Sequence, residues 1–269
     1  MKSLHDFQQG YVTAFHWHTN PNGSQGGRIA DSAKIPTGLF VDRSAIIQSG
    51  AMIEAGVIRI PPRCIIGKNA VIRAAATLKD FSTVGMGSYV GAGSLIGDYS
   101  VIGPDVEIGD QVVIGQCVAV HAGVDIDDNA RIGDYAIIRE RAFVGARCEI
   151  GRYASVGPDA ALEDGARLGD ERSLPAQVSL APGERLIVCH GIEGARGPLS
   201  AAHDGQTIRW TFNGQSGLTT QALLQLDHTS EALAAFVAAV LASPSLTAKT
   251  RKSERAALPA AVLAQTETV

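Results

Sequence analysis

Residues 84–101 read Val84-Gly-Met-Gly-Ser-Tyr, Val90-Gly-Ala-Gly-Ser-Leu and Ile96-Gly-Asp-Tyr-Ser-Val. Each group of six begins with an aliphatic residue and Gly, and places Ser two residues before the next aliphatic. The aliphatic position continues in steps of six at Ile66, Ile72, Leu78, Val84, Val90, Ile96, Ile102, Ile108, Ile114, Val120, Ile126, Ile132, Ile138, Val144, Ile150, Val156, Leu162, Leu168, Leu174 and Leu180. A period of six fits neither an α-helix nor a simple amphipathic strand.

The period fits a coil of three short strands, so that three hexads complete one turn. A small residue stands two positions before each aliphatic one, from Cys64 to Ala166, and a narrow interior needs this pairing of large and small side chains. Upstream the register is shifted by one residue, at Ile29, Ile35, Val41, Ile47 and Ile53, and the slip falls around residues 56–59. Residues 29–182 therefore predict an all-β parallel solenoid of about eight coils, about 40 Å long at 4.7–4.8 Å per coil.

These hexads resemble the hexapeptide-repeat superfamily, and bacterial hexapeptide acyltransferases in particular. The resemblance implies a left-handed parallel β-helix, although the usual handedness of parallel crossovers would predict the opposite. Members of the superfamily include acyltransferases, nucleotide-sugar enzymes, γ-class carbonic anhydrases and noncatalytic β-helical subunits. It also implies a homotrimer with active sites in the clefts between subunits. One scaffold carries several chemistries, so function has to be argued from the site.

The first 28 residues are predicted to cap the open N-terminal end of the solenoid, because an exposed apolar interior needs a cover. The aromatic residues available for this cap are Phe7, Tyr11, Phe15 and Trp17. A second interpretation makes His16 and His18 metal ligands on one strand. No further ligand cluster accompanies these two histidines, so no metal is expected.

Residues 183–245 predict a small α+β unit at the C-terminal end. Residues 186–189 and 207–213 read as strands, residues 214–217 as a turn, and Ser230 as the start of an amphipathic helix. The unit is interpreted as a second cap, or alternatively as an element that binds substrate or a partner. Residues 246–269 predict a flexible tail, whose basic residues Lys249, Arg251, Lys252 and Arg255 are interpreted as solvated.

Composition excludes several classes of partner. The formal net charge is −4, which gives no reason to expect nucleic acid or an anionic membrane as a partner. No run of about 18 apolar residues could span a bilayer, and the N-terminal ten residues lack the apolar stretch of a signal peptide. The four cysteines show no Cys-x-x-Cys spacing, which favours a reducing cytoplasm over a disulfide framework or a zinc site.

Residues three hexads apart stack on neighbouring coils, so the sequence predicts the outer surface. The position after each aliphatic residue is usually Gly, but one column reads Gly67, Gly85, Gly103, His121, Arg139, Gly157. Another column is partly aromatic, with Tyr99, Cys117, Tyr135 and Tyr153, and it would suit the packing of three copies. Charged columns alternate in sign, at Arg131, Glu149 and Arg167 and again at Asp134, Arg152 and Asp170.

Two functions follow as hypotheses. In the first, His121, the only histidine of the repeat, is the general base of an acyltransferase, and Arg139 binds an anionic group of the acyl-CoA or acyl-carrier-protein donor. The acceptor would be a small amine or sugar. In the second, the chain is a noncatalytic trimeric scaffold or binding module. The first rests mostly on how common acyltransferases are in the superfamily. The second is supported by the lack of an inserted loop in residues 60–180 and by the family's catalytic histidines, which typically occupy another repeat position or a projecting loop; His121 would then be a surface or interface histidine. A carbonic anhydrase would need three histidines on zinc, and the repeat contains only His121, so this activity is not expected.

Overall fold

The computed structural model describes residues 3–4, 14–189, 199–204, 206–213, 215–225 and 231–242. The chain divides into two compact units, Met1–Ser173 and Leu174–Val269. Phe7, Tyr11, Ser230 and the basic residues of the tail, for which the sequence made predictions, lie outside the described residues. Among the residues that are described, no helix is long and apolar enough to cross a bilayer.

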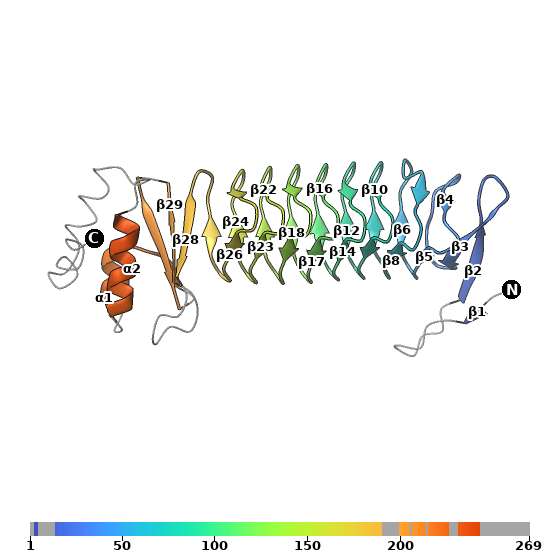
Figure 1. The fold of residues 1–269 in the computed structure, drawn as a ribbon. Helices are drawn as coiled ribbons and strands as arrows, with labels where there is room; N and C mark the ends of the chain where they lie inside the picture. The colour runs from blue at the N-terminus through green and yellow to red at the C-terminus, as the bar shows by residue number, and fades with distance from the viewer. Residues whose placement is uncertain are drawn as a thin grey trace. The chain divides into compact units, whose positions relative to one another are not determined.

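Three sheets form the wall of the first unit, and their strands from β4 onward have two residues each (Figure 1). The first contains β1 (Ser3–Leu4), β2 (Ala14–Thr19), β3 (Gln25–Ala30), β5 (Ile46–Ile47), β8 (Ile65–Ile66), β11 (Thr83–Val84), β14 (Val101–Ile102), β17 (Ala119–Val120), β20 (Ile137–Ile138) and β23 (Ser155–Val156). The second contains β6 (Met52–Ile53), β9 (Val71–Ile72), β12 (Tyr89–Val90), β15 (Glu107–Ile108), β18 (Asp125–Ile126), β21 (Phe143–Val144) and β24 (Ala161–Leu162). The third contains β10 (Thr77–Leu78), β13 (Leu95–Ile96), β16 (Val113–Ile114), β19 (Arg131–Ile132), β22 (Glu149–Ile150) and β25 (Arg167–Leu168), and β4 (Phe40–Val41) pairs separately with β7 (Arg59–Ile60). The repeat continues in β26 (Ser173–Leu174) and β27 (Ser179–Leu180).

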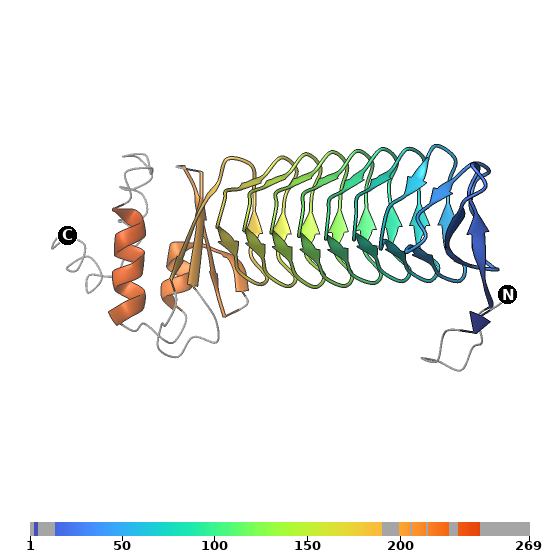
Figure 2. The same cartoon turned by 45° about the vertical axis from the view of Figure 1, so that its right-hand side comes forward.

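Each strand of the repeat pairs in parallel with the strand three hexads later, as Val84 does with Ile102, and Figure 2 shows the resulting stack of coils. The second residue of every repeat strand from β4 to β27 is buried, and the first faces outward. Ladder hydrogen bonds join the coils, for example from the Gly85 N–H to the Ile102 carbonyl at 2.9 Å. The predicted all-β left-handed parallel β-helix of about eight coils is therefore confirmed.

The predicted register slip is also confirmed, and it has a structural consequence. Arg28 pairs with Ile46, three hexads on, whereas Phe40 pairs with Arg59, one position further than three hexads. The extra residue leaves Ile58 81 % exposed. Pro61 directly follows β7, at the position where other coils donate a backbone N–H to the next coil. Proline has no N–H, and β7 does not pair with β10. The third sheet is interrupted there.

The prediction that Ile35 belongs to the buried aliphatic series is wrong. Ile35 is only partly buried and lies outside any strand, although its neighbour Lys34 forms an isolated parallel bridge with Met52. Pro36 follows it and cannot donate the ladder hydrogen bond of that position. Leu39, two residues before Val41, is buried instead.

The N-terminal hairpin of β2 and β3 covers the beginning of the coil stack. Asn20, 3 % exposed, replaces a peptide group there: its Oδ1 accepts the Val41 N–H at 2.8 Å, and its Nδ2 donates to the Val41 carbonyl at 3.2 Å. Phe15 is buried, as a capping residue should be. Trp17 remains 41 % exposed, so it does not serve the cap in the way that the sequence suggested.

The second unit contains an antiparallel sheet in the order β28 (Arg185–Cys189), β29 (Leu199–His203), β30 (Ile208–Phe212) and β31 (Gln215–Leu218), with helices α1 (Thr220–Gln225) and α2 (Glu231–Leu241). The two predicted strands and the helix are confirmed. The turn predicted for residues 214–217 is wrong, because Gln215–Leu218 is a strand, and the strand Leu199–His203 was not predicted. The core of the second unit includes Trp210, Phe212 and Leu233.

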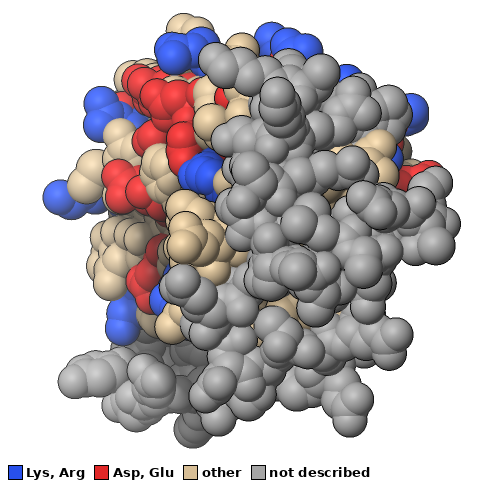
Figure 3. All heavy atoms as spheres, turned by 90° about the vertical axis from the view of Figure 1, so that its left-hand side faces the viewer, with Lys and Arg blue, Asp and Glu red and all other residues tan. Residues whose placement is uncertain are grey.

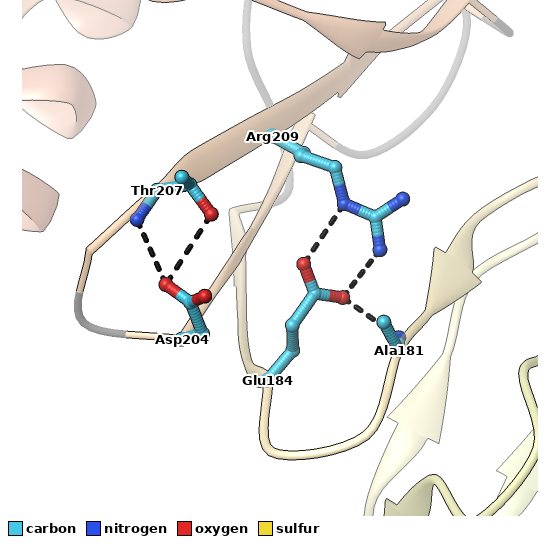
Figure 4. A network of polar contacts seen from close by, with 5 residues as sticks. All are labelled: Ala181, Glu184, Asp204, Thr207 and Arg209. Atoms are coloured by element: carbon cyan, nitrogen blue, oxygen red, sulfur yellow. Dashed lines mark hydrogen bonds and ion pairs between the residues drawn. The ribbon is translucent and has the colours of Figure 1, made fainter.

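A buried carboxylate ties this sheet together (Figure 4). Glu184, whose side chain is 5 % exposed, accepts two hydrogen bonds from the Arg209 guanidinium, one of them from Nε at 2.8 Å. Its Oε2 also accepts the Ala181 N–H at 2.7 Å. The bidentate pair joins the turn before β28 to β30. Nearby, Asp204 accepts the Thr207 N–H at 2.8 Å and closes the turn between β29 and β30.

Candidate active site

His121 follows β17 and lies on the outer surface of the first sheet. Its backbone N–H donates to the Ile138 carbonyl at 2.8 Å, which fixes the residue against the next coil. Its ring Nδ1 lies 2.9 Å from Oε1 of Glu140, and the two side chains are 38 % and 44 % exposed. In the part of the chain that the structure describes, ring nitrogen Nε2 has no hydrogen-bond partner, so it faces solvent beside the surface.

Glu140 was not predicted from the sequence. It directly follows Arg139, the residue that stacks on His121, and so it sits diagonally below His121 on the next coil. Its pKa is lowered, because its own backbone N–H donates to the carboxylate, and further because His121 donates to it and Arg139 lies near. An ionised carboxylate on Nδ1 favours the tautomer whose proton is on that atom. Nε2 is then the basic nitrogen.

Arg139 stacks directly below His121, as the sequence predicted, and its N–H donates to the Val156 carbonyl at 2.9 Å. Its side chain is exposed. The structure thus places both predicted site residues on consecutive coils and adds Glu140, the residue after Arg139, as the hydrogen-bond partner of His121. Together these side chains present a base and a cation to any ligand on this surface.

The position that His121 and Arg139 occupy is otherwise crowded. A Cβ added to Gly85 would lie 2.3 Å from the Gly103 carbonyl oxygen, and one added to Gly103 would lie 2.8 Å from the His121 carbonyl carbon. Glycine at this position lets successive coils approach closely. Two consecutive coils nevertheless carry a long side chain here, which is the pattern expected where side-chain chemistry outweighs close packing.

We call the outer surface of the first sheet, with the corner that precedes its strands, the His121 face. Of the ten large apolar side chains that are exposed among the described residues, seven lie on it: Trp17, Ile65, Tyr99, Val101, Tyr135, Ile137 and Tyr153. Single exposed apolar side chains need no explanation, but a concentration on one face indicates a surface that contacts another molecule.

The corner before this sheet carries a ladder of rings. Phe81 and Tyr99 stack with their ring centroids 4.5 Å apart, and Tyr135 and Tyr153 stack at 4.8 Å. Cys117 occupies the coil between the two stacks, and the pKa of Tyr135 is raised, chiefly by Cys117 beside it and then by Tyr153. The partly aromatic column predicted from the sequence is therefore present.

The histidines at the N-terminus have other partners. His16 Nδ1 lies 2.9 Å from Asp31 Oδ1, and His18 Nε2 bonds to the Leu39 carbonyl at 3.0 Å. Among the described residues, no group of three or more His, Cys, Asp or Glu side chains could hold a metal ion. These contacts support a structural role for both histidines.

Acidic and basic side chains neighbour one another on the surface. Arg167 contacts Glu149 at 3.2 Å and Arg152 contacts Asp170 at 3.8 Å, as the alternating columns predicted. In Figure 3 the acidic side chains gather at the upper left of the view, with basic side chains beside them along the rim. All these ion pairs are exposed and contribute little stability each.

Comparison with known proteins gives these findings. Residues 35–130 match the family model described as the GMPPB C-terminal domain. No curated protein matches the chain. Among solved structures, a UDP-N-acetylglucosamine acyltransferase from Campylobacter jejuni is 16 % identical with a TM-score of 0.46, covering 88 % of this chain and 94 % of that one.

Two further structures are similar. A second acyltransferase of that name, from Francisella novicida, is 22 % identical with a TM-score of 0.31, covering 90 % of each chain. A putative acetyltransferase from Bacillus cereus is 22 % identical with a TM-score of 0.26, covering 43 % of this chain and 76 % of that one. The six-residue repeat and the three parallel sheets that it builds are the features by which the chain resembles the hexapeptide-repeat superfamily.

Proposed function

We propose that the chain is an acyltransferase of the hexapeptide type, with His121 as general base and Glu140 as the residue that positions it. The observation that carries the proposal is the 2.9 Å contact between His121 Nδ1 and Glu140 Oε1. A histidine whose one nitrogen is held by a carboxylate and whose other nitrogen faces solvent is arranged to remove a proton from a nucleophile.

The reaction would begin with Nε2 of His121 taking the proton of an acceptor amine or hydroxyl. The freed electron pair attacks the thioester carbonyl carbon, the C–S bond breaks, and the imidazolium returns the proton to the leaving thiolate. Glu140 stabilises the imidazolium while it is charged. General acid–base catalysis of this kind contributes about 10²–10⁴-fold in rate.

Arg139 would bind the anionic part of a ligand. Its guanidinium is permanently charged and suits phosphate or carboxylate groups in bidentate geometry. Both proposed thioester donors, acyl-CoA and an acyl-carrier protein, carry phosphate. A small amine or sugar remains the proposed acceptor, and donor and acceptor would meet on the His121 face.

A homotrimer in the cytoplasm is part of the proposal. Neighbouring copies would cover part of the exposed apolar surface of the His121 face and would leave His121, with Tyr99 and Tyr135, at the open edge of the interface. Light scattering should report three times the chain mass of 28.1 kDa. A monomer at micromolar concentration would contradict this assembly.

The second candidate function is a noncatalytic trimeric scaffold or binding module. It is favoured by the regularity of the described solenoid, since strands follow one another every six residues from Ile60 to Leu180 without a projecting loop. Such loops commonly wall an active cleft. On this alternative, the His121–Glu140 pair would only join neighbouring coils.

The test is titration calorimetry and turnover with acetyl-CoA and longer acyl-CoA thioesters. His121→Ala should lower turnover by about 10²–10⁴-fold without changing Tm, and Arg139→Ala should mainly weaken donor binding. Arg131→Ala, an exposed cation on the third sheet, is the matched control and should behave like the parent. If neither CoA nor carrier-protein thioesters bind or react, the scaffold alternative replaces the enzyme.

A further inference from the structure

The aromatic ladder of the His121 face has one interruption. Phe81, Tyr99, Cys117, Tyr135 and Tyr153 occupy the same corner position on five successive coils, with φ between 54° and 62°. Such φ values are uncommon for bulky side chains, yet four of the five residues are aromatic. Only the Cys117 coil lacks a ring.

The interruption has the dimensions of one stacked ring. Successive coils are about 4.7–4.8 Å apart, so the coils that carry Tyr99 and Tyr135 lie about 9.5 Å apart along the solenoid, with the small Cys117 side chain on the coil between them. A ring placed at the Cys117 level would be about 4.8 Å from each, close to the 4.5 and 4.8 Å centroid distances of the two existing stacks.

The two tyrosines next to the gap are exposed in the single chain. Tyr99 is 56 % exposed and Tyr135 is 41 % exposed. The outer end of the ladder is already occupied by a planar group, because the Arg63 guanidinium lies 5.2 Å from the Phe81 ring centroid. The Arg63–Phe81 contact therefore shows that a planar group can stack on a ring of this ladder.

The gap also belongs to the same coil as the proposed base. From Cys117 the chain runs through β17 directly to His121, four residues on, about 13 Å in an extended strand. The outward residue between them is Ala119, which pairs with Val101 on one side and Ile137 on the other. Both neighbours are larger and exposed, so the outward side chains around β17, between the gap and His121, are apolar.

We propose that the gap between Tyr99 and Tyr135 binds a planar aromatic ring carried by the acyl group of the substrate. The acyl chain lies over Ala119 and the thioester lies at His121. This inference rests on the proposed function for the identity of the ligand, but the gap itself does not depend on catalysis. Ring faces on both sides select flat rings over puckered ones.

The test compares two thioesters that differ only in ring planarity, 9-phenylnonanoyl-CoA and 9-cyclohexylnonanoyl-CoA, whose acyl chains are long enough to span the distance of about 13 Å from His121 to the Cys117 level. Binding is measured by calorimetry on the full chain, in the parent and in His121→Ala. We expect both proteins to bind the flat ring about tenfold more tightly than the saturated ring, since each ring contact adds to binding beyond its buried area.

Cys117→Phe completes the ladder from within and should abolish the preference for the flat ring. The variant is expected to fold, because Phe81 occupies the same corner position with φ 62°. Gln111→Phe is the matched control: it adds the same side chain at another corner, where φ is 57°, and should leave the preference unchanged. Equal affinity for the two rings, a preference that survives Cys117→Phe, or binding of neither thioester would overturn the proposal.

The same data separate this inference from the proposed function. If the parent prefers the flat ring but shows no turnover, the result would support ring binding between Tyr99 and Tyr135 and contradict the acyltransferase activity. If turnover is lost in His121→Ala but does not depend on ring planarity or on Cys117→Phe, the result would support the acyltransferase activity. It would overturn the proposal that a ring binds between Tyr99 and Tyr135.

Discussion

The solenoid and the C-terminal unit are held together by different kinds of contact. In the solenoid the coils from Cys64 to Leu168 repeat the same inward pair of one aliphatic and one small residue, and each strand there pairs with the strand three hexads further along the chain. In the C-terminal unit, Trp210 and Phe212 pack against helices, and Glu184 and Arg209 form one bidentate pair. The repeated contacts tolerate little change of register, whereas the single contacts concentrate stability in a few residues.

The largest effect on the solenoid should come from a charge in its core. Ile108 is fully buried between Val90 and Ile126, so Ile108→Asp places an unpaired carboxylate in a dry interior. We expect insoluble protein or a loss of several kcal/mol. Glu107→Ala, at the exposed neighbouring position, should change Tm little. A soluble Ile108→Asp protein with the parent's Tm would refute the packing.

A second substitution removes the buried pair of the C-terminal unit. Arg209→Ala leaves the Glu184 carboxylate nearly buried without its cation, at a cost of about 2–3 kcal/mol, below that of a fully buried pair because Arg209 is 36 % exposed. Hydrogen exchange should increase in β28–β30 and remain unchanged in the solenoid. Arg152→Ala, which breaks an exposed pair of the solenoid, should have almost no effect. Equal exchange everywhere would mean that the two units unfold together.

A third test uses pH to separate the units. The pKa of His203 is lowered from 6.5 by burial and then by Arg185, against the opposing effects of Asp204 and Glu184, and its Nδ1 has no hydrogen-bond partner in the described part of the chain. Below about pH 6.5 the unfolded chain binds a proton that the folded chain does not. The free energy of unfolding should therefore decrease as the pH is lowered, by at most about 1.4 kcal/mol per pH unit. Chemical denaturation at pH 7.5 and 5.5 would detect this.

His203→Gln should remove that pH dependence. In the solenoid, the pKa of Asp42 is lowered from 3.8, chiefly by the Ser44 N–H, so its contribution is lost only at lower pH. A parent protein whose C-terminal unit is equally stable at pH 7.5 and 5.5 would contradict the account of His203.

The difference between the units also decides what the sequence could predict. Solenoid contacts are local and periodic, so register, burial and even the slip near Ile58 were predictable. Pro36 and Pro61 remove single ladder hydrogen bonds, which the periodic pattern of side chains does not reveal. In the C-terminal unit the antiparallel pairing depends on long-range packing, and β29 and β31 were missed or misassigned.

The candidate site was predictable only in part. His121 and Arg139 stood out because they replace glycine in a regular column. Glu140 belongs to a neighbouring column and approaches His121 diagonally, from the position next to the one that stacks on it. A search for acidic residues one position beyond the three-hexad stacking distance would have found it.

The most direct test of the proposed catalytic role is the turnover of the double variant His121→Ala, Glu140→Gln beside the two single variants, with a thioester that the parent uses. If Glu140 acts only through His121, the double variant should be no slower than His121→Ala, because a positioning residue has nothing left to position. Additive losses, or turnover that survives His121→Ala, would contradict the assignment of His121 as the base that Glu140 positions.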